Sequence, residues 1–151
     1  MSPSSADPFE LSRFVDAQSS SYSTAIDELK AGQKCSHWMW FIFPQVAGLG
    51  SSTMAKRYAI GSRAEAEAYL EHPLLGQRLE MCVDALLKVA GRSADQIMGF
   101  PDSMKLQSAM TLFAEISPAE SCFEQLLKKY YRGRKDPKTL SFLSQDERKS
   151  A

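Results

Sequence analysis

The residues best suited to chemistry lie in one aromatic stretch, 36–45. It holds both tryptophans of the chain, Trp38 and Trp40, and one of its two histidines, His37. In a helix, His37 and Trp40 would be three residues apart on one face. An aromatic shelf beside a titratable imidazole suits the stacking of a base or sugar, with the histidine as acid, base or donor. The alternative is structural: the aromatic side chains fill the core, and a backbone carbonyl satisfies His37.

A glycine-rich segment, 48–52, follows the aromatic stretch and precedes an expected helix at 53–58. Free amides at a helix N-terminus, with the two serine hydroxyls of the segment, would make a generic anion site. The lysine of a P-loop is absent from the required place. Lys56 and Arg57 are compatible with phosphate contacts and equally with solvated helix positions. An ordinary glycine loop with a serine cap is the alternative.

Polar side chains also flank the apolar stripes of later helices. His72 falls at the end of one expected helix, where a protonated imidazole complements the helix dipole, and Arg78 lies off the stripe of the next. Lys105 and Ser108 share a helix face, in the reverse order of the pairs that activate serine nucleophiles. They could line a polar cleft together with Thr111, or hold solvent-facing and structural positions.

A basic run lies near the C-terminus. Six lysines and arginines fall between 128 and 138, with Asp136 as the local acid. Such a patch can contact phosphate or nucleic acid, but a solvated helix end explains it equally, because cations complement the helix dipole there. The formal net charge of the chain is zero, so no overall field attracts nucleic acid or an anionic membrane.

The remaining chemistry-bearing residues form no known pattern. The three cysteines, Cys35, Cys82 and Cys122, lack metal-binding spacing, and we expect reduced thiols, no metal and no cofactor. The longest apolar run, 38–43, is too short to cross a bilayer, and 1–7 lacks a signal-peptide pattern. We therefore expect a soluble cytoplasmic protein without membrane contact. Nucleic acid is not expected as a partner, and the oligomeric state stays open.

Hydrophobic periodicity predicts an all-α fold of about eight helices, several of them short. The clearest stripe recurs at intervals of four, three, four and three residues, in a long helix at 74–90 around which the others pack. The aromatic stretch could be a buried strand or helix, and we favour a helix that Pro44 ends. The 151 residues are expected to form one domain, ordered over about 7–143, with 1–6 and 145–151 flexible.

Helix-start signals set three further boundaries. Asp7 is expected to cap a first helix beginning at Pro8, because a cap residue followed by proline is a common start. Capping boxes at 62–65 and 117–120 are expected to open two later helices. Asp136 and Pro137 should start a short last helix.

Several blocks of the chain together resemble a bacterial family, domain of unknown function family 1810. The matching blocks are His37-Trp38-Met39-Trp40-Phe41-Ile42-Phe43-Pro44-Gln45, Gly48-Leu49-Gly50, Tyr58-Ala59-Ile60, the spaced residues of 65–79, Asp102-x-x-Lys105-Leu106-x-Ser108, Met110-Thr111-Leu112-Phe113 and Asp136-x-x-Thr139-Leu140. The resemblance covers about residues 7–143 and implies a compact multi-helical fold. The chain departs from the pattern at Gln107, where a serine is common. The calpastatin label of some members does not suit a short chain patterned for a core.

The resemblance implies no activity, but its shared polar residues suggest a hypothesis. They would converge on one cleft that binds an anionic small molecule, such as a nucleotide or an ADP-ribose-like ligand. Whether the protein is an enzyme stays open, although a faint likeness to helical glycosidase-type domains of ADP-ribose metabolism suggests a hydrolase or N-glycosidase. The catalytic candidates are His37, Lys105 and Ser108. The ligand-binding candidates are Trp38, Trp40, Gln45, Tyr58, His72, Arg78, Lys105, Ser108 and Thr111.

Two other classes of function remain compatible with the sequence. The basic run at 128–138 could make the protein an interaction or nucleic-acid-contact module. A structural helper without a ligand is the third interpretation.

Overall fold

The computed structural model of the protein describes residues 7–150, and the expectations for 1–6 and 151 lie outside this range. The all-α prediction is confirmed. Within the described residues the chain forms ten helices and, outside them, one isolated parallel β-bridge between Val46 and Ile60. The helices are α2 (Ser12–Ser19), α3 (Tyr22–Ala31), α4 (Met39–Ile42), α5 (Thr53–Arg57), α6 (Arg63–Glu71), α7 (Leu75–Lys88), α8 (Ala94–Met98), α9 (Asp102–Glu115), α10 (Cys122–Tyr131) and α11 (Pro137–Ser150).

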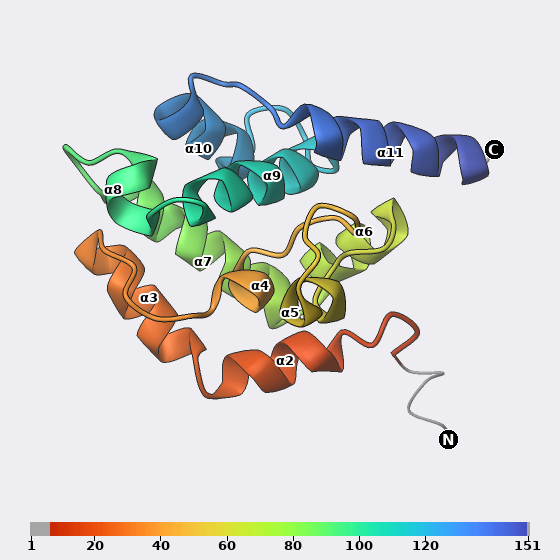
Figure 1. Ribbon diagram of the computed structural model, residues 1–151, viewed down its shortest axis with the longest axis horizontal. Coiled ribbons are helices and arrows are strands. Elements are labelled where there is room, and N and C mark those ends of the chain that lie inside the picture. The colour runs from red at the N-terminus through yellow and green to blue at the C-terminus, as the bar shows by residue number, and fades with distance from the viewer. Residues whose placement is uncertain (1–6, 151) are drawn as a thin grey trace.

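Helix α7 runs through the middle of the molecule, as the sequence predicts (Figure 1). Helices α3, α6 and α10 pack against it, while α9 packs against α8, α10 and α11. The predicted stripe faces the core, with Leu75, Leu79, Cys82 and Leu86 almost fully buried. Helix α9 is buried on most of its sides over 108–114, so it forms a second centre of the core.

Residues 39–42 of the aromatic stretch form the short helix α4, which confirms the helical interpretation for this part. His37 lies before the helix, so the prediction that it shares a helical face with Trp40 is wrong. Pro44 follows Phe43, the residue at which the helix ends. From there the chain continues through a glycine loop to α5, whose cap is the expected serine, Ser52. Helices α4 and α5 lie in front of α7 in Figure 1, between α2 and α6.

Two predicted helix starts are wrong. Helix α2 begins at Ser12, because Glu10 takes a left-handed backbone conformation (φ 52°). The Asp7 carboxylate still caps it, accepting hydrogen bonds from the amides of Leu11 (2.7 Å) and Ser12 (3.0 Å). The Asp-Pro pattern therefore predicts the capping residue correctly, but not the residue at which the helix begins.

Helix α10 also begins later than predicted. The expected box at 117–120 does not form, since Glu120 has a left-handed conformation (φ 65°). Ser121 caps the helix instead, and its hydroxyl accepts the amide hydrogen of Glu124 at 3.3 Å.

The last helix is longer than predicted. Helix α11 continues over the tail from 145 that we expected to be flexible. Its distal half contacts α6, because Asp146 accepts a hydrogen bond from the amide of Arg63 at 2.9 Å and Glu147 pairs with the Arg63 guanidinium at 3.1 Å. These contacts join the tail to a helix far away in sequence.

The junction of α6 and α7 has no room for a side chain at Gly76. A Cβ atom there would lie 2.0 Å from the carbonyl oxygen of Leu70, which belongs to the backbone and cannot rotate away. His72 completes the turn, because its Nδ1 accepts hydrogen bonds from the amides of Leu74 (3.1 Å) and Leu75 (3.3 Å). His72 therefore has a structural role at the junction of the two helices.

Gly76→Ala should destabilise the protein by about 3 kcal/mol, because the two helices must separate to admit one methyl group. Gly61→Ala is the matched control: its Cβ would meet Glu65 Oε1 at 3.5 Å, an ordinary contact. Urea unfolding of both variants measures the difference. Equal stability of the two variants would show that the junction is not tightly packed.

Candidate functional site

The start of the aromatic stretch is fixed by one carboxylate, that of Glu28 on α3. Its Oε1 accepts hydrogen bonds from the amides of Cys35 (2.8 Å) and Ser36 (3.0 Å) and from the indole of Trp38 (2.9 Å). Its Oε2 accepts the Ser36 hydroxyl at 2.6 Å. Burial by itself would raise the pKa of Glu28, but these four donors outweigh it and lower the pKa to about 2.

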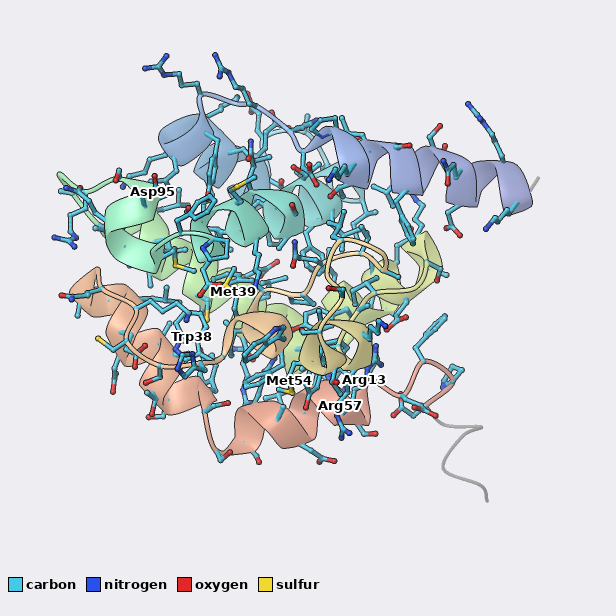
Figure 2. The ribbon with its side chains drawn as sticks, in the orientation of Figure 1. Arg13, Trp38, Met39, Met54, Arg57 and Asp95 are labelled. Atoms are coloured by element: carbon cyan, nitrogen blue, oxygen red, sulfur yellow. The ribbon has the colours of Figure 1, made fainter. Side chains whose placement is uncertain are left out.

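This arrangement gives the two tryptophans different roles. Trp38 is 1% exposed, and its indole nitrogen already donates to Glu28, so it belongs to the core. Its predicted place in a binding site is not supported by this geometry. Trp40 is only half-buried and lines a small pocket. Figure 2 shows Trp38 on the α3 side of α4.

The pocket beside Trp40 has a volume of about 130 Å³. Three of the predicted binding residues line it. Its walls are held together by the β-bridge, in which the Ile60 amide donates to the Gln45 carbonyl (2.8 Å) and the Ala47 amide donates to the Ile60 carbonyl (2.9 Å). The lining residues are Trp40, Gln45, Val46, Ala47, Gly48, Gly50, Ala55, Lys56, Tyr58 and Ala59.

The glycine loop forms one wall of this pocket. Gly48 has a positive φ of 93°, which a side chain would disfavour. Gly50 packs so closely on α5 that an added Cβ would lie 2.6 Å from the Ala55 Cβ. Ser52 caps α5 through the Ala55 amide at 3.1 Å, so the loop has the structure of an ordinary serine-capped turn.

Two lysines lie on or next to the pocket. Lys56 lies on its wall and forms no ion pair with any described residue. Lys105 lies over the Trp40 ring, with its Nζ 5.9 Å from the centroid. Lys105 shares the Asp102 carboxylate (3.6 Å) with Lys34 (2.9 Å), which lies over the Trp38 ring.

The C-terminal end of α5 is held by Arg13, whose five N–H groups are all used. Its guanidinium donates to the carbonyls of Phe9, Glu10, Arg57 and Ala59 and to the carboxylate of Glu65 at 2.7 Å. Arg13 and Arg57 lie close together in Figure 2. A polar hollow of about 510 Å³ opens there and shares Lys56 and Ala59 with the pocket beside Trp40.

Arg78 lies in a different part of the molecule. It contacts the buried Gln18 (3.4 Å) and covers the ring of Tyr22 at 4.7 Å. The Gln18 amide in turn donates to the Phe41 carbonyl (2.7 Å) and to the Tyr69 hydroxyl (3.1 Å). Arg78 therefore belongs to a buried polar network that joins α2, α4, α6 and α7.

Ser108 and Thr111 connect α9 to the start of α11. The Ser108 hydroxyl donates to Asp136 at 2.9 Å, and Thr111 Oγ1 accepts the Asp136 amide hydrogen at 2.9 Å. The same Asp136 carboxylate oxygen accepts the Thr139 hydroxyl at 2.6 Å. Ser108 and Thr111 thus both have structural partners, and neither they nor Lys105 line any of the four pockets described for residues 7–150.

The two histidines also lie apart from each other. His37 is exposed and makes no hydrogen bond or ion pair with the described residues. His72 is the cap between α6 and α7. Of the predicted site residues, the structure thus brings together Trp40, Gln45 and Tyr58, with Lys105 beside Trp40, while Trp38, His72, Arg78, Ser108 and Thr111 have structural contacts elsewhere.

Half of the basic run has local partners. Lys129 donates to the carbonyls of Leu87 and Val89, which caps the C-terminus of α7. Lys128 pairs with Glu124 at 3.5 Å and Lys135 with Glu115 at 2.6 Å. Arg132, Arg134 and Lys138 remain exposed, so the basic surface is smaller than the sequence suggests.

Three further features of the described residues concern the cysteines, the possible metal ligands and the apolar character of the helices. All three cysteines are free thiols, and within 7–150 no group of three or more His, Cys, Asp or Glu is placed to hold a metal ion. None of the helices in that range has the length and apolar character needed to cross a membrane.

Comparison with known proteins identifies the class to which this helical fold belongs. The family described as "Protein of unknown function (DUF1810)" matches residues 8–143, so the chain belongs to this family and the predicted resemblance is confirmed. The crystal structure of the conserved hypothetical protein Rv1873 from Mycobacterium tuberculosis is similar, with a TM-score of 0.90 and 52% identity. The match covers 91% of this chain and 99% of that one. No curated protein matches the chain.

Glu28, Arg13 and Gln18 position the pocket but are not among the site residues predicted from the sequence. Glu28 and Arg13 resemble ordinary solvated helix residues in the sequence, because no local pattern shows that distant backbone groups will reach them. The burial of Gln18 could have been predicted from its spacing, because it follows Phe14 by one helical turn and so lies on the apolar face of α2.

Glu28→Gln should lower the free energy of unfolding by about 2 kcal/mol at pH 7, since a neutral amide accepts these donors less strongly. The pKa of Glu28 is lower in the folded protein than the ordinary value of 4.5, so its stabilisation is complete above pH 4.5 and is lost as the pH falls towards 2. The stability gap between wild type and variant should therefore narrow below pH 4.5 in urea titrations. Asp27→Asn, on the exposed side of α3, is the control, and a pH-independent gap would contradict the assignment.

Ser108→Ala should reduce stability by about 1 kcal/mol, because Asp136 loses one donor. Ser141→Ala, an exposed serine on α11, should have no measurable effect. If Ser108→Ala were as stable as wild type in thermal unfolding, the structural role assigned to this hydroxyl would be wrong.

Proposed function

We propose that the protein binds an anionic small molecule, a nucleotide or ADP-ribose-like ligand, at the pocket beside Trp40. The proposal rests on one observation: three of the polar and aromatic residues singled out in the sequence line one pocket, and the unpaired Lys56 lies on its wall. An aromatic surface next to a free cation is a combination that binds bases and phosphates.

The size of the pocket limits how such a ligand would be held. About 130 Å³ is below the usual range of roughly 300–1,000 Å³ for small-molecule sites, so the pocket takes one ring or one phosphate group. The adjoining hollow of about 510 Å³ supplies the remaining space. A ligand that passes over Lys56 would stack its base on Trp40 and place its phosphates near Arg57.

Charge in the adjoining hollow also favours an anion. Arg13 and Glu65 neutralise each other at 2.7 Å. Lys56 and Arg57 then face only Glu10 among the remaining lining residues, which leaves one net positive charge. Gln45, which is among the lining residues, carries an amide donor and acceptor suited to the edge of a base.

The pocket beside Trp40 favours binding over hydrolysis. Its described lining residues include no carboxylate and no imidazole, the groups that most often act as general acid or base. Lys105 and Ser108, the other catalytic candidates, do not line it. We therefore propose ligand binding and assign no N-glycosidase step to this site.

A thermal-shift screen against ADP, ADP-ribose, NAD and sugar phosphates tests the proposal. A ligand at a hundredfold excess over its dissociation constant should stabilise the fold by about 2.7 kcal/mol. Lys56→Met should weaken binding about tenfold through the loss of one charge contact. Lys88→Met, a lysine on α7 that pairs only with Asp84, is the matched control. A flat screen at millimolar ligand, or equal effects of the two variants, would contradict the proposal.

A further inference from the structure

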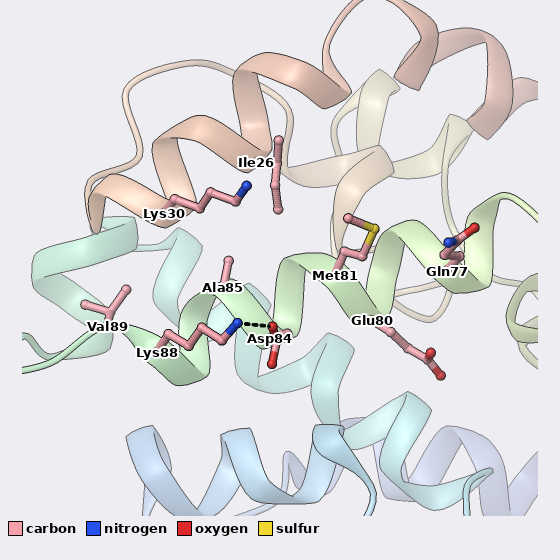
Figure 3. Close-up of a pocket in the computed structure, with 9 residues that line it drawn as sticks. All are labelled: Ile26, Lys30, Gln77, Glu80, Met81, Asp84, Ala85, Lys88 and Val89. Atoms are coloured by element: carbon pink, nitrogen blue, oxygen red, sulfur yellow. Dashed lines mark ion pairs between the residues drawn. The ribbon is translucent and has the colours of Figure 1, made fainter.

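A second and larger depression lies between α3 and α7. It has a volume of about 620 Å³. The α7 residues that line it recur at helical spacing and form one continuous face of the helix (Figure 3). They are Gln77, Glu80, Met81, Asp84, Ala85 and Lys88, and α3 contributes Ile26 and Lys30. We refer to this depression as the α3–α7 groove.

The floor of the α3–α7 groove is apolar. Ile26 and Ala85 form it and are 8% and 6% exposed. Met81 stands in the groove with 48% of its surface exposed, and it is one of three large hydrophobic residues exposed in the described part of the chain. Flexible methionine side chains adapt to apolar partners and are common at peptide-binding surfaces. Covering an exposed methionine above a buried apolar floor would remove apolar surface from water, so this arrangement favours the binding of an apolar partner.

The charged residues that line the groove differ between its two ends. Lys88 and Asp84 pair with each other at 3.0 Å and cancel. Glu80 and Lys30 form no ion pair with described residues, and they lie towards opposite ends of the groove in Figure 3. Among the residues that line the groove, the anion Glu80 therefore lies towards the start of α7 and the cation Lys30 towards its C-terminus.

We infer that the α3–α7 groove binds an amphipathic helix of a partner protein, oriented parallel to α7. The lining from Gln77 to Lys88 spans twelve residues, a rise of about 16 Å, which is the length of three helical turns. A helix in this orientation places the positive end of its dipole near Glu80 and its negative end near Lys30. Its apolar stripe would lie on Met81, Ala85 and Ile26, as in other helix-in-groove complexes. The inference is independent of the site beside Trp40.

Selection from a displayed library of 14-residue peptides tests the inference. Peptides selected on the wild type should show apolar residues at i, i+3, i+4 and i+7, with basic residues in the first turn and acidic residues in the last. Met81→Arg should weaken their binding by about tenfold or more, whereas Met104→Arg should leave it unchanged. Met104, on α9, is 56% exposed and outside the groove, so it is a matched control. Circular dichroism verifies that both variants are folded.

A charge exchange tests the orientation. The double variant Lys30→Glu, Glu80→Lys should select peptides with acidic residues first and basic residues last. An unchanged charge order would overturn the parallel orientation. The inference as a whole would be overturned if no peptides are enriched, if the enriched peptides lack helical periodicity, or if Met81→Arg binds them as well as wild type. Occupation of the groove by a second copy of the chain, seen as a dimer in sedimentation, would also overturn it.

Discussion

The proposed site depends on the interaction between the Glu28 carboxylate and the segment 35–38. This segment follows the end of α3 and precedes a helix of four residues, which is too short to be stable by itself. The position of Glu28 is fixed, because its helix α3 packs on α7. Its two oxygens bind two amides, a hydroxyl and an indole, so the chain enters α4 with Trp38 in the core and Trp40 directed to the pocket.

Two further contacts extend this constraint along the aromatic segment. Buried Gln18 holds the carbonyl of Phe41, and the bridge between Val46 and Ile60 holds the chain after Pro44. Arg13 then fixes the backbone at Arg57 and Ala59. The pocket is thus built from irregular chain that long side chains of neighbouring helices hold in place. Such a surface is pre-organised, because its backbone groups already have their partners.

Much of the fold follows from local patterns in the sequence. The stripe of α7, the serine caps at Ser52 and Ser62 and the left-handed Gly32 after α3 are all determined within a few residues. The boundaries of α2 and α10 could not be predicted in this way. In both helices a glutamate adopts a positive φ just before the helix, a conformation that no local signal marks.

The candidate site was predictable only in part, because residue type does not show which side of an element faces the core. Trp38 and Trp40 look equivalent in the sequence, and only the indole bond to Glu28 distinguishes them. The residue types and spacing of Ser108 and Thr111 suggest that both line a polar cleft. In the structure Ser108 instead bonds to the Asp136 carboxylate and Thr111 to the Asp136 amide, 25 or more residues away. Contacts of this range depend on the packing of α9 against α11.

The indole signals in a ¹H–¹⁵N NMR spectrum provide the most direct test of ligand binding at Trp40. The chain has two tryptophans, so the spectrum contains two indole N–H resonances, one for each role assigned above. Titration with ADP-ribose or ADP should shift the Trp40 resonance and leave that of the buried Trp38 in place. If neither resonance moves at millimolar ligand, or if both move together, the site beside Trp40 is not where an anion binds.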